Sequence, residues 1–362
     1  MYRPSLIVFV VLAMSLAAAS GCGGRDSNSA LSTSGPRIYV SDETGGRVAV
    51  IDPDAGRVVT TLAVGKRPRG IRLIDGGKQV LVALSGSPIA GPGVDESKLP
   101  PGDRKADGIG VVDLASLKVA RVMKSGQDPE AFAVSPDEKT VYVSNEETGE
   151  MSAVDIAGGE VRGSVKVGDE PEGVAVRPDG KVVYVTSEGD NAIAAIDAAT
   201  MKEIARMPVG ARPRGIVFTH DGAKAFTTSE NGGVVTVLDA QAHKVLSTIT
   251  LPRPTAAGAI PPRPMGAVLS PDGGTLYVTT GRAKSIVAID VASLAIIHTF
   301  DDIGARPWGI GISADGRTLY TANGPSGDVS VVDAASGKVV RRIAVGGSPW
   351  GLVVAPPTEA PR

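Results

Sequence analysis

Short apolar runs alternate with turn-forming clusters along most of the chain. One representative stretch has four such runs, at 173–177, 182–186, 192–196 and 203–207. The clusters between them are rich in Gly, Pro, Asp and Asn, which favour tight turns. Runs of about five residues bounded in this way are typical of β-strands. The stretch therefore predicts four short antiparallel strands.

The pattern repeats seven times. An Asp closes one apolar run per repeat, a Pro opens another, and a ring or apolar residue lies at the start of a third. The Asp column is Asp52, Asp113, Asp155, Asp197, Asp239, Asp290 and Asp333. The Pro column is Pro68, Pro129, Pro171, Pro213, Pro264, Pro307 and Pro349. The third column is Tyr39, Leu81, Tyr142, Tyr184, Phe226, Tyr277 and Tyr320.

These columns define a unit of 42 residues. Four short strands per repeat of about 40–45 residues predict a β-propeller blade. We therefore expect an all-β fold, a seven-bladed β-propeller of four-stranded antiparallel blades, over residues 37–355, followed by a short tail at 356–362. The first repeat starts at a second strand, and residues 351–355 form a lone first strand. This predicts a 3+1 closure between the two ends, which deletion of the residues after Pro349 would open.

Composition agrees with this reading. The 362 residues include Gly 46 and Pro 26, which disfavour a helical bundle, and 42% are hydrophobic, which excludes a disordered chain. A net charge of −2 gives no reason to expect a nucleic-acid partner.

The N-terminal region has the pattern of an export signal. Residues 6–19 form an uncharged apolar run that is too short to span a bilayer, and small residues then precede Cys22, the chain's single cysteine. This pattern resembles a bacterial lipoprotein signal, with residues 1–21 removed, Cys22 lipidated and 22–36 a flexible tether. The alternative is an ordinary secretory signal. The resemblance implies a lipid-anchored, extracytoplasmic protein, on the periplasmic side of the outer membrane in a diderm host.

The Tyr-Val-Ser-Asn and Tyr-Val-Thr strands resemble the YVTN family of β-propeller repeats. Motifs around the Pro column resemble the propeller proteins associated with PQQ-dependent catabolism: Gln127-Asp128-Pro129-Glu130, Glu170-Pro171-Glu172-Gly173, Arg212-Pro213-Arg214, Arg306-Pro307-Trp308 and Ser348-Pro349-Trp350. More distant resemblances are to the haem d1 propeller of cytochrome cd1 nitrite reductases, the quinoprotein amine dehydrogenase β chain and seven-bladed lactonase-like propellers. They imply PQQ or haem as cofactors, and a periplasmic redox enzyme or another envelope protein as partner.

One face of the predicted ring, here called the top, is chemically elaborated. Both long insertions, within 85–107 and around 252–262, fall in loops of this face. Residues flanking the Pro column supply charges and both tryptophans there, and a further column holds Glu43, Glu146, Glu188 and Glu230. The candidate ligand-binding residues are Arg67, Arg69, Glu130, Glu172, Arg212, Arg214, Arg263, Arg306, Trp308 and Trp350.

Two interpretations of the top face stay open. Arginine forks and indole faces suit a small anionic aromatic ligand. Alternatively, Arg and Glu on neighbouring blades neutralise one another and the tryptophans pack the ring. His220, His243 and His298 all fall away from the top face, and no nucleophile elbow, phosphate loop or metal cluster is found.

Three functions follow. The first is a non-enzymatic binding or scaffold protein that serves a periplasmic quinoprotein dehydrogenase or electron-transfer system. The second is a lactonase-like or haem d1-type enzyme, in which Glu130→Gln or Glu172→Gln abolishes turnover. The third is a structural surface protein.

Overall fold

The computed structural model describes residues 35–89, 98–253 and 258–356. The chain divides into two units, Met1–Thr33 and Ser34–Arg362, and every described residue belongs to the second. The leader, Cys22 and most of the tether predicted above lie outside the described residues, as do positions 357–362 of the tail.

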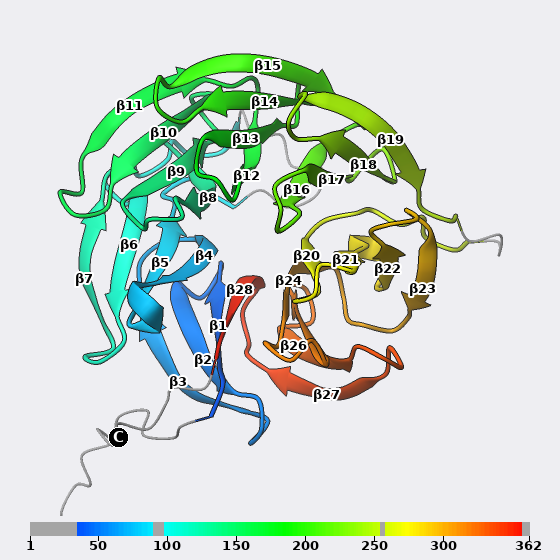
Figure 1. Ribbon diagram of the computed structural model, residues 1–362. Coiled ribbons are helices and arrows are strands. Elements are labelled where there is room, and N and C mark those ends of the chain that lie inside the picture. The colour runs from blue at the N-terminus through cyan, green and yellow to red at the C-terminus, as the bar shows by residue number, and fades with distance from the viewer. Residues whose placement is uncertain (1–34, 90–97, 254–257, 357–362) are drawn as a thin grey trace, which may run out of the picture. The chain divides into compact units, whose positions relative to one another are not determined.

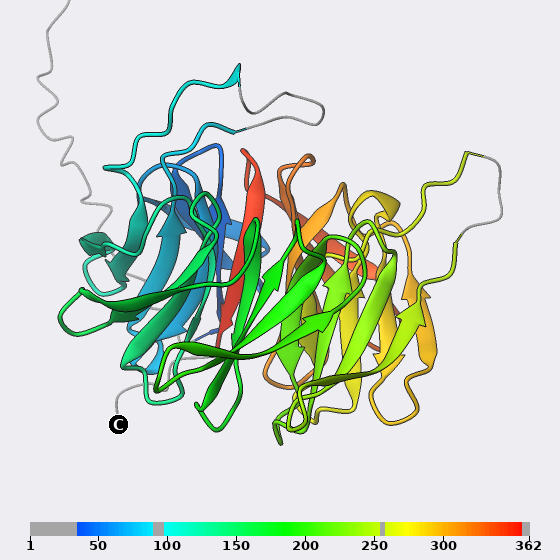
Figure 2. The same cartoon turned by 90° about the horizontal axis from the view of Figure 1, so that it is seen from above.

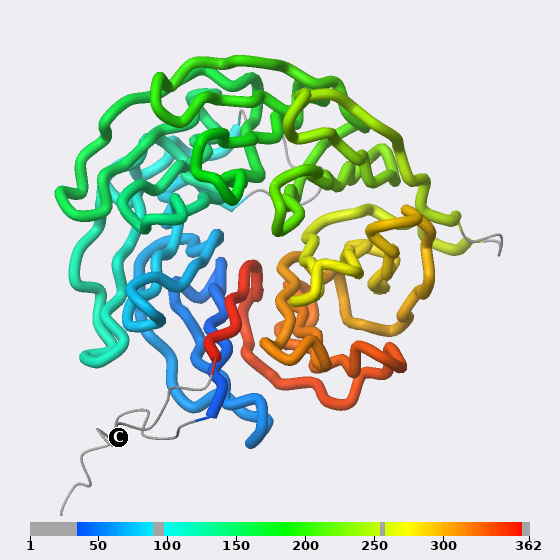
Figure 3. The backbone as a smooth tube through the Cα atoms, viewed as in Figure 1, coloured from blue at the N-terminus to red at the C-terminus, as the bar shows by residue number. Residues whose placement is uncertain are grey.

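Seven four-stranded antiparallel sheets form a ring around a central axis (Figures 1 and 3). The closing blade contains β28 (Pro349–Ala355), β1 (Arg37–Asp42), β2 (Arg47–Asp52) and β3 (Arg57–Ala63). The next three blades are β4 (Pro68–Ile74), β5 (Gln79–Leu84), β6 (Gly108–Asp113), β7 (Lys118–Met123); β8 (Pro129–Val134), β9 (Thr140–Asn145), β10 (Glu150–Asp155), β11 (Val161–Lys166); and β12 (Pro171–Val176), β13 (Val182–Ser187), β14 (Ala192–Asp197), β15 (Lys202–Pro208). The last three are β16 (Pro213–Phe218), β17 (Lys224–Ser229), β18 (Val234–Asp239), β19 (Lys244–Thr250); β20 (Ala267–Leu269), β21 (Thr275–Thr279), β22 (Ile286–Asp290), β23 (Ile296–Phe300); and β24 (Pro307–Ile312), β25 (Thr318–Asn323), β26 (Asp328–Asp333), β27 (Val339–Ala344). Two short 3₁₀ turns, η1 (Asp75–Gly77) and η3 (Gly281–Ala283), complete the described elements.

The predicted closure is confirmed. Strand β28 pairs antiparallel with β1, with Ile38 opposite Val354 and Val40 opposite Leu352. Figure 1 shows the C-terminal strand beside the first strand of the chain. The closing blade thus takes three strands from one end of the propeller and one from the other, and β28 covers the edge that β1 would otherwise expose.

The core lies between neighbouring blades. The second and third strands of each blade carry its most buried residues; β13, for example, is buried throughout. Between two blades, Tyr142 and Met151 of one sheet pack with Val183, Val185 and Ile196 of the next. The fourth strands are largely exposed along the rim, as in β15. Burial on both faces of each sheet therefore makes every blade depend on its neighbours.

The Asp column has the structural role that its turn position predicts. Each member accepts a hydrogen bond from a backbone N–H two or three residues further on, as Asp197 does from Thr200 at 2.8 Å. The other six follow the same pattern, at Asp52, Asp113, Asp155, Asp239, Asp290 and Asp333. These turns join the third and fourth strands of each blade on one face of the ring, here called the bottom.

The described parts of the two long insertions emerge on one face, between β5 and β6 and between β19 and β20 (Figure 2). This is the top face, at which the innermost strand of each blade begins. No helix in the described ranges is long and apolar enough to cross a bilayer.

Candidate functional site

The innermost strands bring seven equivalent positions to the mouth of a central channel. Six of these strands begin at a Pro of the repeat column, and the seventh, β20, begins three residues after Pro264. In every blade the residue after the Pro points its side chain toward the channel mouth or an adjoining blade. These residues are Arg69, Glu130, Glu172, Arg214, Met265, Trp308 and Trp350. Glu172, Arg214, Trp308 and Trp350 are sequence candidates that line the channel cavity. Arg69 and Glu130 are sequence candidates that do not line it. Met265 lines it but was not a sequence candidate.

A hydrogen-bonded latch between blades fixes the backbone at this position. The hydroxyl of Thr186, on the second strand of one blade, donates to the carbonyl of Arg214 on the next blade at 3.1 Å. Equivalent latches join Ser41 to Arg69, Ser144 to Glu172, Thr228 to Met265 and Thr279 to Trp308. These hydroxyls are the Ser or Thr of the Tyr-Val-Ser/Thr motif. The motif therefore positions the site residues of the neighbouring blade.

The glycine two residues after each Pro permits this close approach. An added Cβ at Gly173 would lie 2.1 Å from the carbonyl oxygen of Arg214, and one at Gly266 would lie 2.4 Å from that of Trp308. Neither position has room for a side chain, so the Pro-x-Gly turn reflects packing between blades.

The residue before the Pro adopts a left-handed backbone conformation in five of the seven blades. The φ angles are 44° at Arg67, 53° at Asp128, 49° at Glu170, 56° at Arg212 and 50° at Arg306. This conformation is costly for a non-glycine residue, and a following Pro restricts the backbone further. Such recurrent strain is characteristic of functional surfaces.

Arg69 organises an acidic group of side chains on one side of the mouth. Its guanidinium, 2% exposed, contacts Asp128 at 2.7 Å, Glu130, and Glu146 at 3.5 Å. Arg67 pairs with Glu43 at 2.9 Å. We call these six residues the Arg69 cluster. The cluster contains two cations and four carboxyl groups. Arg67 and Arg69, which sequence analysis assigned to ligand binding, are therefore both engaged in ion pairs with the protein's own carboxyl groups.

Arg214 organises a second group across the mouth. Its Nη1 lies 2.5 Å from both Glu172 and Glu188, and its Nε lies 3.0 Å from Glu230. Arg212 contacts Glu188 at 2.6 Å. Arg263 and Arg306 make longer contacts with Glu230, at 3.7 and 3.9 Å. These seven residues are the Arg214 cluster.

Protonation leaves this cluster positive. Burial, together with the neighbouring charge of Glu172, raises the pKa of Glu188 to about 9, against the effect of Arg214. Glu188 is therefore protonated at neutral pH. Burial acts to raise the pKa of Glu230, but Arg214 and Arg212 outweigh it and the pKa is lowered. With Glu188 neutral, the four guanidiniums of the cluster outnumber its two remaining carboxyl groups, those of Glu172 and Glu230.

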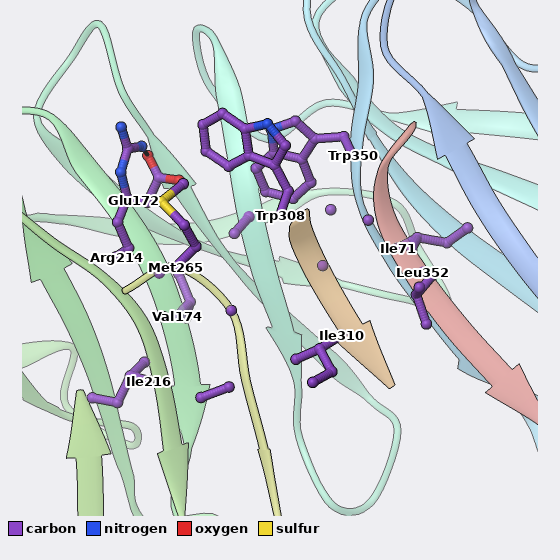
Figure 4. A pocket seen from close by; sticks show the side chains of 18 of the residues that line it. Ile71, Glu172, Val174, Arg214, Ile216, Met265, Trp308, Ile310, Trp350 and Leu352 are labelled. Atoms are coloured by element: carbon purple, nitrogen blue, oxygen red, sulfur yellow. Dashed lines mark hydrogen bonds and ion pairs between the residues drawn. The ribbon is translucent and has the colours of Figure 1, made fainter. Parts of the chain in front are cut away.

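The two tryptophans stack at the edge of this positive cluster (Figure 4). Their ring centroids lie 5.9 Å apart, with 20° between the planes. Arg306 lies over the Trp308 ring at 4.4 Å, and Arg214 lies at 5.4 Å. Burial lowers the pKa of Arg306, and Arg214, Arg282 and Arg212 add to this effect. Arg306 nevertheless stays charged at any ordinary pH.

Below the mouth, the channel contains a cavity of about 160 Å³. Its wall combines polar and apolar surface, and the apolar side chains include Ile71, Val174, Ile216, Ile310 and Leu352 (Figure 4). Arg72 also lines it, and sequence analysis missed this residue. The sequence contained one sign of it. Arg72 lies four positions after Pro68, and the residue at this position is uncharged in the other six repeats.

A second cavity of about 430 Å³ lies beside the Arg69 cluster. Arg67, Arg104, Asp128, Glu146 and Glu147 are among the residues that line it. Burial raises the pKa of Glu146 to about 7, although Arg69 opposes the shift. Its side chain is still 32% exposed, so water can reach a carboxyl group that titrates near neutrality.

No set of His, Cys, Asp and Glu side chains in the described part of the chain is arranged to hold a metal ion. The three histidines lie away from the channel mouth. His220 and His243 occupy bottom turns, where His243 Nδ1 lies 2.7 Å from the hydroxyl of Tyr184, and His298 lies in the outer strand β23.

Two family models match parts of the sequence. A YNCE-like β-propeller model matches residues 93–224, and a seven-bladed β-propeller lactonase model matches residues 178–347. No curated protein matches the sequence significantly.

Several solved structures share the fold. A functionally unknown protein from Desulfotomaculum acetoxidans is 16% identical, with 89% of this chain and 99% of that chain covered and a TM-score of 0.72. A proposed 6-phosphogluconolactonase from Bacteroides fragilis is 18% identical, with 90% and 99% covered and a TM-score of 0.69. Hydrazine synthase from Kuenenia stuttgartiensis is 20% identical, with 78% and 88% covered and a TM-score of 0.64. At these identities the likeness concerns the fold alone. The chain is a seven-bladed β-propeller, and parts of it match the lactonase and YNCE-like propeller models.

Proposed function

We propose that the protein binds a flat or ring-shaped organic anion at the channel mouth, between the Trp308–Trp350 pair and the Arg214 cluster. The observation that carries this proposal is the position of Arg306 over Trp308, within a cluster that has an excess of positive charge. An indole face binds a planar ring, while a guanidinium with few carboxylate contacts binds its acid group. Arg306 has one such contact among the described residues, at 3.9 Å.

PQQ meets this description, because it is planar and carries three carboxylates. Arg212, Arg263 and Arg306 would hold those carboxylates, and the bound quinone would supply two-electron redox chemistry. Haem does not fit the described residues equally well. Its iron needs an axial ligand such as histidine, and none of the three histidines lies near the channel.

On this proposal, the protein serves a quinoprotein dehydrogenase or another electron-transfer enzyme of the cell envelope as a binding partner. The resemblance to PQQ-associated propellers and the sequence around Cys22 support that setting. The redox enzyme would be the partner, and the lipid on Cys22 the attachment to the membrane.

Fluorescence titration tests the binding proposal, because both tryptophans of the chain lie at the site. A fragment of residues 30–362 contains every described strand, including the β1–β28 pair. We expect saturable quenching by PQQ, corrected for absorption, and its loss in Arg306→Ala. Arg317→Ala, in an exposed bottom turn, is the matched control and should bind like the wild type. Unchanged quenching in Arg306→Ala would refute the proposed site.

Hydrolysis of a lactone is a second candidate function, and Glu146 favours it. A partly exposed carboxyl group with a pKa of about 7 can accept a proton from an attacking water and return it to the leaving alkoxide. The lactonase family match over 178–347 gives independent support. Glu130 and Glu172 are deeply buried in ion pairs, so Glu146 is the better choice of base.

Turnover of glucono-δ-lactone and 6-phosphogluconolactone, followed by acid release above the spontaneous rate, tests this second function. Turnover that is lost in Glu146→Gln and retained in Glu147→Gln would support it. Absence of turnover by the wild type with either lactone would leave binding as the proposed function.

A further inference from the structure

Arg72 stands alone as a charged residue inside the channel. Of the residues that line the cavity, only Arg72, Glu172 and Arg214 carry charge, and Glu172 and Arg214 pair with each other. Arg72 is exposed, and the space to which it is exposed is the cavity enclosed by the innermost strands.

The contacts of Arg72 leave most of its hydrogen-bonding capacity unused. Its Nη1 donates to the carbonyl of Ile71 at 2.9 Å, and no carboxylate in the described ranges forms an ion pair with it. By contrast, Arg69, three residues earlier on the same strand, contacts three carboxyl groups. A guanidinium has five N–H donors in a planar fork, so several remain for a group inside the cavity.

The surroundings of Arg72 make an anion favourable there. The protein around the channel lowers the pKa of Arg72 by desolvation, yet an arginine stays protonated under these conditions. Protein atoms surround the guanidinium on the walls of the channel, so a charge there attracts an anion more strongly than one on an open surface does.

The repeat pattern shows that the fold itself does not need this charge. The residues that occupy the same place in the other six blades are small or apolar: Ala133, Ala175, Val217, Val268, Gly311 and Val353. Six blades therefore form with an uncharged residue at this place, and the packing of the blade does not explain the arginine. A ligand that supplies the missing negative charge accounts for its presence.

We propose that Arg72 binds the oxyanion of a small molecule, a carboxylate or a phosphate, inside the central channel. The planar fork suits two oxygens of either group, and the apolar wall of Ile71, Ile216, Ile310 and Leu352 packs against the rest of the molecule. The cavity that Arg72 lines adjoins Trp308 and Trp350 at the mouth, but Arg306 does not line it. The two proposals therefore rest on different guanidiniums, and neither requires the other.

Isothermal titration calorimetry of the full chain in an uncharged detergent tests the inference. Acetate, gluconate and inorganic phosphate are titrated in a low-salt buffer without chloride. We expect saturable binding of at least one of them, and the class that binds identifies the oxyanion. Arg72→Gln should weaken that binding at least about tenfold, as expected for loss of a charged hydrogen-bonded pair. Arg72→Lys should bind with intermediate affinity, because it keeps the charge and loses the fork.

Two controls separate this site from other effects. Arg57→Gln removes an exposed arginine at the start of β3, away from the channel mouth, and should leave binding unchanged. Arg72→Gln should fold, because it removes one described hydrogen bond, and its melting temperature verifies this. The inference is overturned if Arg72→Gln binds as tightly as the wild type, or if none of the three anions binds the wild type saturably.

Discussion

The guanidinium of Arg306 lies over the indole of Trp308, with its central carbon 4.4 Å from the ring centroid. The backbone of Trp308 is fixed as well, because its carbonyl accepts a hydrogen bond from the hydroxyl of Thr279 on the preceding blade at 3.3 Å. The pair is thus fixed by the ring of blades before any ligand arrives. Preorganisation of this kind reduces the entropy cost of binding.

The first prediction concerns this pair. Trp308→Leu should weaken PQQ binding by about one order of magnitude, since both the ring stack and the cation–π contact are lost. Equilibrium dialysis measures this without relying on tryptophan fluorescence. His298→Leu, on the outer strand β23, is the control. Equal affinities for both variants would argue that the ligand does not contact Trp308.

The second prediction concerns the Arg214 cluster. Arg214→Met leaves three buried carboxyl groups without their shared cation, and should lower the free energy of unfolding by about 3–5 kcal/mol. Urea denaturation measures the change. Arg206→Met breaks more exposed ion pairs with Glu203 and Asp190 and should cost about 1 kcal/mol or less. Similar losses for both would show that the cluster contributes little to stability.

The third prediction concerns the inter-blade latch. Thr186→Val removes the hydroxyl that donates to the Arg214 carbonyl and accepts from the Gly173 N–H at 2.7 Å. We expect a loss of about 1–3 kcal/mol, because buried partners are left unsatisfied. Thr200→Val, in an exposed bottom turn, should change stability much less. Thermal unfolding of the two variants under one set of conditions provides the comparison.

The fourth prediction concerns pH. Burial beside Glu172 raises the pKa of Glu188 to about 9, above the value of about 4.3 expected for an unfolded chain. The folded protein therefore binds this proton more tightly, and the stabilisation is complete below the unfolded pKa and declines as the pH rises toward 9. Urea midpoints should fall between pH 5 and 9 in the wild type and change less in Glu188→Gln. An equal slope in both would assign the decline to other groups.

The fifth prediction concerns Cys22, which lies outside the described residues. If it carries the lipid anchor, the wild type should sediment with membranes, and Cys22→Ser should abolish lipid labelling at this position. Incorporation of a radiolabelled fatty acid measures this directly. Lack of label in the wild type would favour the ordinary secretory signal.

The sequence predicted much of the fold because each blade repeats the same physical requirements. The Pro, Asp and ring columns mark strand starts and turns that depend only on local chemistry, and the lone strand at 351–355 predicted the closure. The glutamate column was also visible. Which arginine each glutamate meets was not, because that depends on how far one blade is rotated against the next. Glu188, for instance, contacts Arg212 and Arg214 of the following blade.

Other parts of the site had no clear sequence signal. The Ser and Thr of the strand motif looked like ordinary β-formers, and their hydrogen bonds to the next blade require the assembled ring. Arg67 and Arg69 looked like ligand-binding residues, whereas the fold places them among carboxyl groups. Arg72 lies in a strand that otherwise reads as apolar, so its position inside the channel followed only from the structure.

The pairing of β28 with β1 links the binding site to the completeness of the polypeptide. Strand β28 carries Trp350 and is the last of the described strands along the chain, whereas its partner β1 is the first of them. A product of premature termination before Pro349 therefore lacks the second indole and leaves the edge of β1 unpaired. Ligand binding would then distinguish molecules that contain β28 from truncated ones, in which the unpaired edge of β1 is open to proteolysis.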